Sequence, residues 1–219
     1  MWSNRSIDLT GHNDRPIHNR FYAHEDGSTR LAVMIAGFAY TLESPFLFYS
    51  KHPPFRAGWD VLAVDFEYSR TADFVAAEGS EQESWFRDDV QGLAAYLANQ
   101  RSYETVSFIG KSIGTTAVFL LLQDAGIREM TDRIIWLTPA QMTGKIVATV
   151  EREPLRSFFV YGDRDRYANE LPADRLESLP HVDVQVIPGA DHALEREDPG
   201  DSVDSLREYV KRLEEFYAS

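Results

Sequence analysis

A serine between two glycines carries the clearest chemistry in this sequence, in a G-x-S-x-G motif at residues 110–114 with Ser112 at its centre. An apolar run precedes the motif at residues 105–109, and another apolar stretch follows it at residues 115–124. This pattern predicts a strand, a sharp turn and a buried helix. Such a turn raises the serine hydroxyl above the sheet and places the Ile113 amide at a helix N-terminus, where it can face a developing oxyanion. A turn that merely links two elements is the alternative.

A serine hydroxyl is a weak nucleophile until a base takes its proton, and histidine has a pKa suited to that task. Of the six histidines, His192 directly follows an apolar run at residues 182–187, whereas His181 precedes that run and the others precede Ser112. Ligands of parallel α/β sheets bind beyond the carboxyl ends of the strands, so we expect His192 to be the base. A surface histidine in an aspartate-rich loop is the alternative.

A histidine base needs a carboxylate that holds its tautomer and stabilises the imidazolium. Asp163 and Asp165 both follow an apolar run at residues 157–161, so both are candidates. An aspartate early in a tight turn commonly bonds the turn itself, which gives Asp163 a structural role and favours Asp165 as the partner of the base. Asp191 precedes the histidine directly, and we expect its side chain to point elsewhere.

Apolar runs alternate with stretches of helical periodicity along the whole chain. We expect strands over residues 19–24, 30–36, 59–66, 105–109, 133–137, 157–161 and 182–187. We expect helices over residues 81–100, 115–124, 140–151 and 201–217, and one from about residue 43 that a Pro-Pro pair at 53–54 ends or interrupts. Near-continuous apolar strands between amphipathic helices predict an α/β protein whose mostly parallel, doubly wound sheet is covered on both faces.

Length and charge limit the domain organisation and the partners. The 219 residues suffice for one domain, which we expect at residues 19–219, after a polar segment at residues 1–18 that lies loosely on the surface. A formal net charge of −13 leaves no cationic surplus to neutralise phosphates, which argues against nucleic acid and anionic membranes as partners. We therefore expect a small-molecule substrate.

Composition also excludes several kinds of site. The chain has no cysteine, hence no disulfide, thiolate metal site or cysteine nucleophile. Its acidic residues form no ligand-spaced cluster with histidines, so we expect neither a metal nor another cofactor. No stretch approaches the roughly 18 apolar residues of a membrane span, and the first residues lack the apolar core of a signal peptide, so we expect a cytoplasmic protein.

The three motifs together resemble those of the α/β-hydrolase superfamily. They are the serine motif at residues 110–114, Gly-Asp-Arg-Asp at 162–165 and Gly-Ala-Asp-His at 189–192. The resemblance covers nearly the whole chain, and the chain is similar to small bacterial serine hydrolases of this superfamily. In the family the acid commonly stands three residues after the strand-end glycine, which supports Asp165. Many relatives insert a cap domain where this chain has only residues 138–154, so we expect an α/β-hydrolase fold without a large cap domain.

The resemblance also implies a second oxyanion donor in the loop after the strand at residues 30–36. Many members begin that loop with His-Gly, whereas this chain has Ala36-Gly37. Because the donor is a backbone amide, the change of side chain need not matter. The amide of Phe38 is our candidate, with that of Ala39 as the alternative.

Two further segments could shape the substrate site. Residues 67–80 could roof it in place of a cap, although we favour an ordinary surface loop. Phe46, Phe48 and Tyr49 could line an acyl or aromatic pocket, although we favour packing of their helix against the sheet.

The expected reaction is hydrolysis of a small soluble carboxylic ester or thioester through an acyl-enzyme. Ser112 attacks the carbonyl, His192 moves the proton, Asp165 orients the histidine, and the amides of Ile113 and Phe38 hold the oxyanion. The same residues would serve an amide or peptide hydrolase. A third possibility, from another class, is a non-catalytic binding protein on a hydrolase fold.

Overall fold

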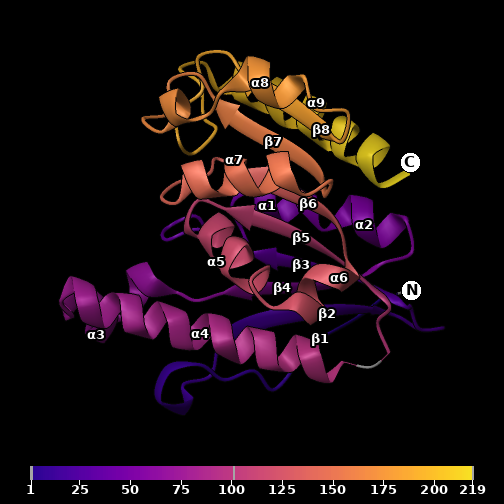
Figure 1. The fold of residues 1–219 in the computed structure, drawn as a ribbon, viewed down its shortest axis with the longest axis vertical. Helices are drawn as coiled ribbons and strands as arrows, with labels where there is room; N and C mark the ends of the chain where they lie inside the picture. Colours follow the sequence, from indigo (N-terminus) through magenta and orange to yellow (C-terminus); the bar gives the residue numbers. More distant parts are fainter. Residues whose placement is uncertain (1, 101, 219) are drawn as a thin grey trace.

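The computed structural model describes residues 2–100 and 102–218 and contains one eight-stranded sheet (Figure 1). The strand order across the sheet is β1-β2-β4-β3-β5-β6-β7-β8. The strands are β1 (Trp2–Arg5), β2 (His18–His24), β3 (Arg30–Ile35), β4 (Asp60–Asp65), β5 (Thr105–Lys111), β6 (Thr131–Leu137), β7 (Arg156–Gly162) and β8 (Val182–Ile187).

The six strands from β4 to the β8 edge are parallel, and β1 and β2 are antiparallel to their neighbours. This confirms the expected mostly parallel sheet. Along the chain, β4 joins one side of β3 and β5 joins the other, so the direction of winding reverses at β3. Ile35 at the end of β3 pairs with Gly110 of β5. The serine turn therefore lies at the carboxyl edge of the sheet beside the point of reversal, where open α/β sheets bind ligands.

Helices cover both faces of the sheet. They are α1 (Pro45–Ser50), α2 (His52–Arg56), α3 (Ala72–Ala76), α4 (Gly79–Asn99), α5 (Ile113–Leu121), α6 (Ala125–Met130), α7 (Thr143–Arg152), α8 (Ala173–Glu177) and α9 (Pro199–Ala218), with 3-10 turns η1 (His12–Asp14), η2 (Tyr68–Arg70) and η3 (Ala168–Glu170). The apolar cluster on one face contains buried residues of α4, α5 and α7, and the cluster on the other face contains residues of α1 and α9. Only α7 lies in the connection from β6 to β7, so this connection holds no large cap domain.

The Pro-Pro pair starts a helix instead of ending one. The helix expected from about residue 43 is two short helices, α1 with Pro45 in its first turn and α2 with Pro53 in its first turn. A proline is tolerated there because the first-turn N–H groups have no acceptor within the helix. Within the described residues 2–100 and 102–218, no helix is both long enough and apolar enough to cross a bilayer.

The N-terminal segment is fixed to the domain, so our expectation that it lies loosely was wrong. β1 pairs with β2, with Arg5 opposite Phe21. Leu9 and Ile17 are almost completely buried in the core cluster that includes α4. The segment has few apolar residues, but these two supply the burial that holds it.

The stretch at residues 67–80 is also more ordered than the surface loop that we favoured. It forms η2, α3 and the start of α4. Tyr68 and Phe74 are buried, and their rings stack with centroids 4.1 Å apart. These two aromatic side chains hold the segment against the core.

Candidate functional site

Ser112 occupies a strained turn between β5 and α5. Its φ of 54° and ψ of −117° lie in a region that a residue with a side chain rarely adopts. The turn is held by hydrogen bonds from the Ser112 N–H to the carbonyl of Leu137 (3.0 Å) and from the Thr115 N–H to the carbonyl of Ser112 (2.9 Å). The backbone therefore fixes the direction of the serine side chain.

The glycines of the motif are required by close backbone contacts. A Cβ atom at Gly110 would lie 2.7 Å from the carbonyl oxygen of Gly114, and one at Gly114 would lie 2.4 Å from that of Ile35. Neither neighbour is a flexible side chain that could move away. Thus β3, β5 and α5 approach so closely that only glycine fits at both positions.

The structure brings Ser112, His192 and Asp165 together in one hydrogen-bonded line, in which His192 lies between the other two and bonds to both. His192 Nε2 lies 2.8 Å from Ser112 Oγ, and His192 Nδ1 lies 2.7 Å from Asp165 Oδ2. The three residues follow β5, β8 and β7, respectively. The side chain of Asp165 is 1% exposed, whereas that of His192 is 30% exposed. The carboxylate is thus enclosed, and the imidazole can meet a ligand.

Asp165 keeps its charge although it is enclosed. Burial alone raises the pKa of this carboxyl, but hydrogen bonds from His192 and from the backbone N–H of Tyr167 outweigh that effect and lower its pKa below the ordinary value. The Tyr167 N–H lies 3.0 Å from Asp165 Oδ1, so both carboxylate oxygens have partners. An ionised Asp165 favours the proton on Nδ1 of His192 and leaves Nε2 free to accept one from the serine.

The two other aspartates near the histidine shape the loops, as expected. Asp163 Oδ1 accepts a hydrogen bond from the Gly189 N–H at 2.6 Å and so joins the loop after β7 to the loop after β8. Asp191 Oδ1 accepts from the N–H groups of Ala193 (2.8 Å) and Glu195 (3.1 Å). Both carboxylates thus serve backbone groups.

Solved structures share this architecture over nearly the full length of the chain. A predicted CIB-like hydrolase from Thermoplasma acidophilum has a TM-score of 0.66 at 17% identity and covers 98% of this chain and 99% of its own. Est1E from Butyrivibrio proteoclasticus, solved with bound ferulic acid, has a TM-score of 0.62 at 14% identity over 93% and 95% of the two chains. XC6422 from Xanthomonas campestris, described as an α/β serine hydrolase without lid, has a TM-score of 0.64 at 15% identity over 97% and 93%. The chain has the α/β-hydrolase fold. Neither the family models nor the curated protein sequences that we compared match it.

The two predicted oxyanion donors lie on the wall of a single cavity in this α/β-hydrolase fold. Ile113 is the first residue of α5, so its N–H has no acceptor within the helix. Phe38 follows β3, and its side chain is 44% exposed. Both residues line a cavity of about 420 Å³ that also borders α3, α4 and the loop before α7. Ala39, the alternative donor, does not line this cavity.

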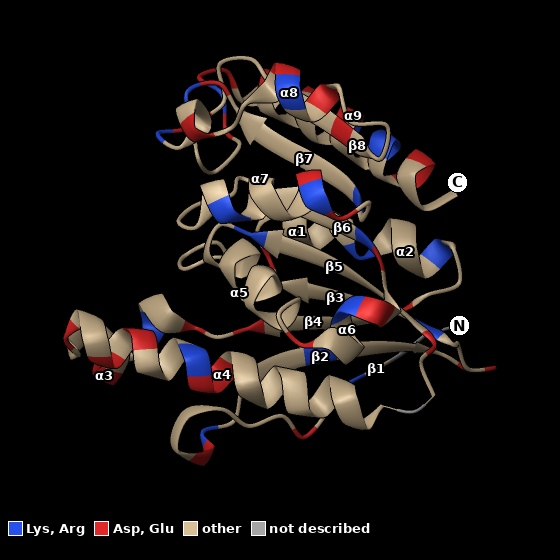
Figure 2. Ribbon diagram, viewed as in Figure 1, with Lys and Arg blue, Asp and Glu red and all other residues tan. Residues whose placement is uncertain are grey.

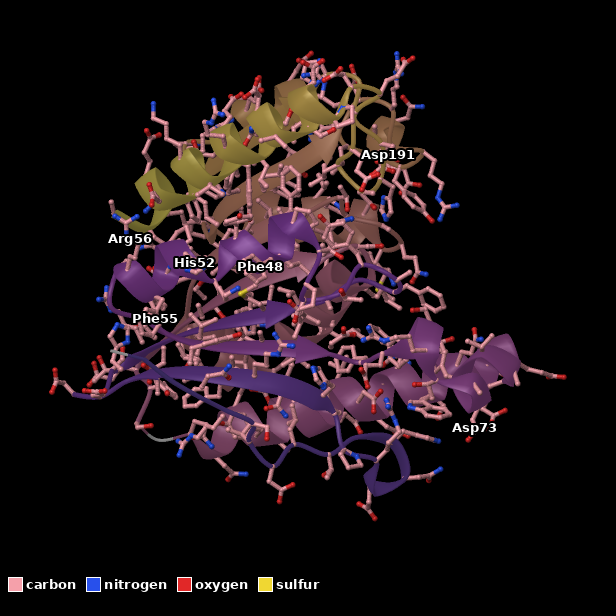
Figure 3. All side chains as sticks on the ribbon, turned by 180° about the vertical axis from the view of Figure 1, so that it is seen from behind. Phe48, His52, Phe55, Arg56, Asp73 and Asp191 are labelled. Carbon is pink, nitrogen blue, oxygen red and sulfur yellow. The ribbon has the colours of Figure 1, made fainter. Side chains whose placement is uncertain are left out.

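The aromatic residues of α1 lie on the other face of the sheet. Phe46 packs on Tyr209 of α9 with ring centroids 5.1 Å apart, and Phe48 meets Tyr49 edge to face at 5.3 Å. Figure 3, seen from behind, shows Phe48 and His52 on the face formed by α1, α2 and α9. None of the three predicted residues lines the cavity beside Ile113. Phe46 is buried, as the packing of the helix that we favoured requires, whereas Tyr49 is 45% exposed.

Lys111 is the residue of the site to which the sequence assigned no role. It is fully buried, and its Nζ donates to Thr138 Oγ1 (2.5 Å) and to the backbone carbonyl of His192 (2.6 Å). The ammonium also lies 4.6 Å from the ring centroid of Tyr40. Burial lowers the pKa of Lys111 to about 7, against the opposing effect of Asp165 and a neighbouring aspartate. A fully buried lysine is rare, so no sequence pattern indicated it.

Metal chemistry has no visible site in the part of the chain that the structure describes. No group of three or more histidine, aspartate or glutamate side chains within residues 2–100 and 102–218 is arranged to hold a metal ion.

Proposed function

We propose that this protein is a serine hydrolase that cleaves a small carboxylic ester or thioester through an acyl-enzyme on Ser112. The observation that carries the proposal is the hydrogen-bonded line from Ser112 through His192 to Asp165 at the carboxyl edge of the sheet. A serine in a strained turn, a histidine with one free nitrogen and a buried carboxylate are the parts that acyl transfer needs.

The proposed reaction begins when His192 Nε2 takes the proton of Ser112 Oγ as that oxygen attacks the carbonyl carbon. The amides of Ile113 and Phe38 hold the oxyanion, and Asp165 stabilises the imidazolium. The intermediate collapses, the bond to the leaving alcohol or thiol breaks, and the leaving group takes the proton from His192. Water then gives a proton to His192 as its oxygen attacks the acyl carbon. When this second intermediate collapses, the bond from the acyl carbon to Ser112 Oγ breaks, His192 returns the proton to Oγ, and the acid leaves.

Two of the structural relatives offer analogies, one for the substrate and one for the absence of a lid. Est1E was solved with ferulic acid, a carboxylic acid such as ester hydrolysis releases, and XC6422 is described as a serine hydrolase without lid. The present chain likewise has only α7 between β6 and β7. We infer that its substrate reaches the serine without the opening of a cap domain.

The proposal is tested by treating the purified protein with a fluorophosphonate probe and mapping the labelled residue. We expect labelling at Ser112, with loss of labelling in Ser112→Ala and His192→Ala, and retention in the control Ser178→Ala, which changes an exposed serine. A folded protein that stays unlabelled would contradict the proposal and favour a non-catalytic binding protein. Rates on matched ester, thioester and amide substrates then distinguish an esterase from an amide hydrolase.

A further inference from the structure

The cavity beside Ile113 has a rigid aromatic wall. Phe74 is buried between Tyr68, which stacks on it at 4.1 Å, and Trp85, which meets it edge to face at 5.5 Å. The ring of Phe38 lies next to that of Phe74, with ring centroids 6.3 Å apart at an angle of 52°. Phe38 nevertheless stays 44% exposed, so much of this large apolar side chain has no protein partner. A bound apolar group could cover it.

Two polar side chains of this cavity are already bonded to the protein. The side-chain amide of Gln82 donates to the carbonyl of Phe74 (2.9 Å), and Thr116 Oγ1 donates to that of Ala140 (3.2 Å). On the rim, Arg87 Nη2 pairs with Glu83 Oε1 at 2.7 Å. The two charges of this pair cancel, so the cavity favours an uncharged group over a carboxylate or an ammonium.

The position of the cavity matches the path of an acyl group. Ile113 directly follows the nucleophile, and an oxyanion held by the amides of Ile113 and Phe38 would leave the acyl chain beside these residues. The first turns of α4 and the whole of α3 extend past the sheet on this side (Figure 1). A volume of about 420 Å³ lies near the lower end of the usual range for small-molecule sites, about 300–1,000 Å³.

We propose that this cavity binds the acyl group of the substrate and selects an uncharged aryl-alkanoyl group, a ring on a short linker. The proposal rests on the function proposed above, because it assumes an acyl group on Ser112. Two further wall residues, Leu120 and Met142, complete the apolar surface.

The proposal is tested by comparing kcat/KM for the 4-nitrophenyl esters of 3-phenylpropionate and acetate. We expect the wild type to favour the phenylpropionyl ester by tenfold or more, and Leu120→Trp, which fills the cavity, to reduce that ratio at least tenfold. The matched control is Val203→Trp, an exposed position in a separate groove beside α9, which should leave the ratio unchanged. A preference for acetate, or a ratio that only Val203→Trp changes, would overturn the proposal.

A binding experiment distinguishes failure of the cavity proposal from failure of the hydrolase proposal. Titration of Ser112→Ala with the uncharged 3-phenylpropionamide, followed by NMR, should show saturable binding that the added Leu120→Trp change weakens at least tenfold. If the wild type resists the fluorophosphonate while this binding is present, the hydrolase proposal fails and the cavity stands. If Ser112 is labelled but neither the ester ratio nor the titration depends on Leu120, the cavity proposal alone fails.

A second observation, the buried contacts of Lys111, carries an independent inference. Its Nζ joins the loop after β6, through Thr138, to the loop after β8, through the carbonyl of His192. A displacement of the loop that carries His192 away from the serine would move that carbonyl and break the contact. We infer that Lys111 is a positioning residue that holds His192 over Ser112.

Removal of the lysine contact should therefore affect catalysis more than folding. Lys111→Met keeps the length of the side chain and removes both hydrogen bonds, so we expect kcat to fall about 10²-fold with KM little changed, as for a small misplacement of a reacting group. Lys111→Gln, which is uncharged but still a donor, should retain more activity than Lys111→Met. Lys145→Met, an exposed position on α7, is the matched control.

A pH profile distinguishes this role from a merely structural one. The titratable groups that face Lys111 are Tyr40, Asp165 and Asp191, and its Nζ also meets the backbone carbonyl of His192. Lys111 helps to lower the pKa of Asp165, so the acid limb of kcat/KM should move to higher pH in Lys111→Met. Equal kcat values for the Lys111→Met and Lys145→Met proteins would overturn the inference, as would a loss of kcat explained by a lower melting temperature.

Discussion

Asp165 combines two properties that usually exclude each other, since its side chain is almost completely buried and its pKa is nevertheless lowered. Burial disfavours the charged form, and hydrogen bonds from His192 and the Tyr167 N–H more than compensate. The carboxylate is therefore ionised throughout the neutral pH range. It fixes the tautomer of the histidine that the proposed reaction needs.

Replacing Asp165 by Asn should lower kcat by about 10³–10⁴-fold, because an amide can donate to Nδ1 and so favours the wrong tautomer. Steady-state kinetics on a 4-nitrophenyl ester measure this effect. Asp174→Asn, an exposed change of the same type on α8, is the control and should behave as the wild type. An Asp165→Asn protein with wild-type kcat would show that the carboxylate does not orient the base.

Lys111 gives the folded protein a specific pH dependence. Its folded pKa of about 7 lies below the ordinary value of 10.5, so between these values the unfolded chain binds more protons and stability rises with pH. We predict that urea unfolding from pH 7 to 9.5 gives a free energy of unfolding that rises more steeply for the wild type than for Lys111→Met. Equal slopes would mean that the buried lysine titrates near its ordinary pKa.

The three candidate site residues were largely predictable, because each stands just after an apolar run and the sheet brings those strand ends together. Ser112, Asp165 and His192 lie in one hydrogen-bonded line, as the motifs indicated. Lys111 was not predictable, since whether a lysine at a strand end is buried depends on the loops that surround it. The cavity was not predicted for a related reason. Phe74, which lines it, belongs to the mostly polar stretch at residues 67–80.

At the level of elements, strands with strong apolar runs were predicted well, and elements held by tertiary contacts were not. β8 spans the predicted residues 182–187. β1 is a short antiparallel edge strand whose sequence, Trp-Ser-Asn-Arg, lacks an apolar run, and its pairing with β2 fixes it. The short helices α3, α6 and α8 were missed as well, because helices of one or two turns have little intrinsic stability and depend on packing.

The fixed N-terminal segment leads to a prediction for α4. A Cβ atom at Gly92 would lie 2.0 Å from the carbonyl oxygen of Thr10, so Gly92→Ala must push the segment away from the helix. We expect a loss of about 1–3 kcal/mol in the free energy of unfolding, although alanine is the better helix former. Gly144→Ala on α7 is the matched control, since its Cβ would meet nothing within 4 Å, and it should stabilise the protein by about 0.5–1 kcal/mol. Urea unfolding measures both, and a stabilised Gly92→Ala protein would contradict the close contact.

At the level of the whole molecule, charge is concentrated on the outer helices and loops, and most of the sheet is free of it (Figure 2). The net charge of −13 means that these surface groups repel one another on balance. Exposed ion pairs such as Arg56–Glu214 oppose this repulsion only weakly.

Added salt should therefore stabilise the protein. Raising NaCl from 0.01 M to 0.15 M shortens the Debye length from about 30 Å to about 8 Å and screens the net repulsion. We expect the melting temperature to rise by about 2–4 °C, the shift that corresponds to about 1 kcal/mol in a domain of this size. Thermal unfolding followed by circular dichroism measures it, and a fall in melting temperature would show that the ion pairs outweigh the repulsion.

The order of strands across the sheet also decides when, during folding, the proposed activity can arise. Ser112 and His192 are 80 residues apart in the chain, and the loop that carries the histidine follows β8, the strand at the edge of the sheet. A partly folded chain in which β3, β4 and β5 have paired already has its serine turn but no base, and such a serine is inert. Contacts between distant parts of a chain form late because closing long loops is entropically costly. We therefore expect the proposed reactivity of Ser112 only in the fully assembled sheet, and no hydrolysis by a refolding or misfolded chain.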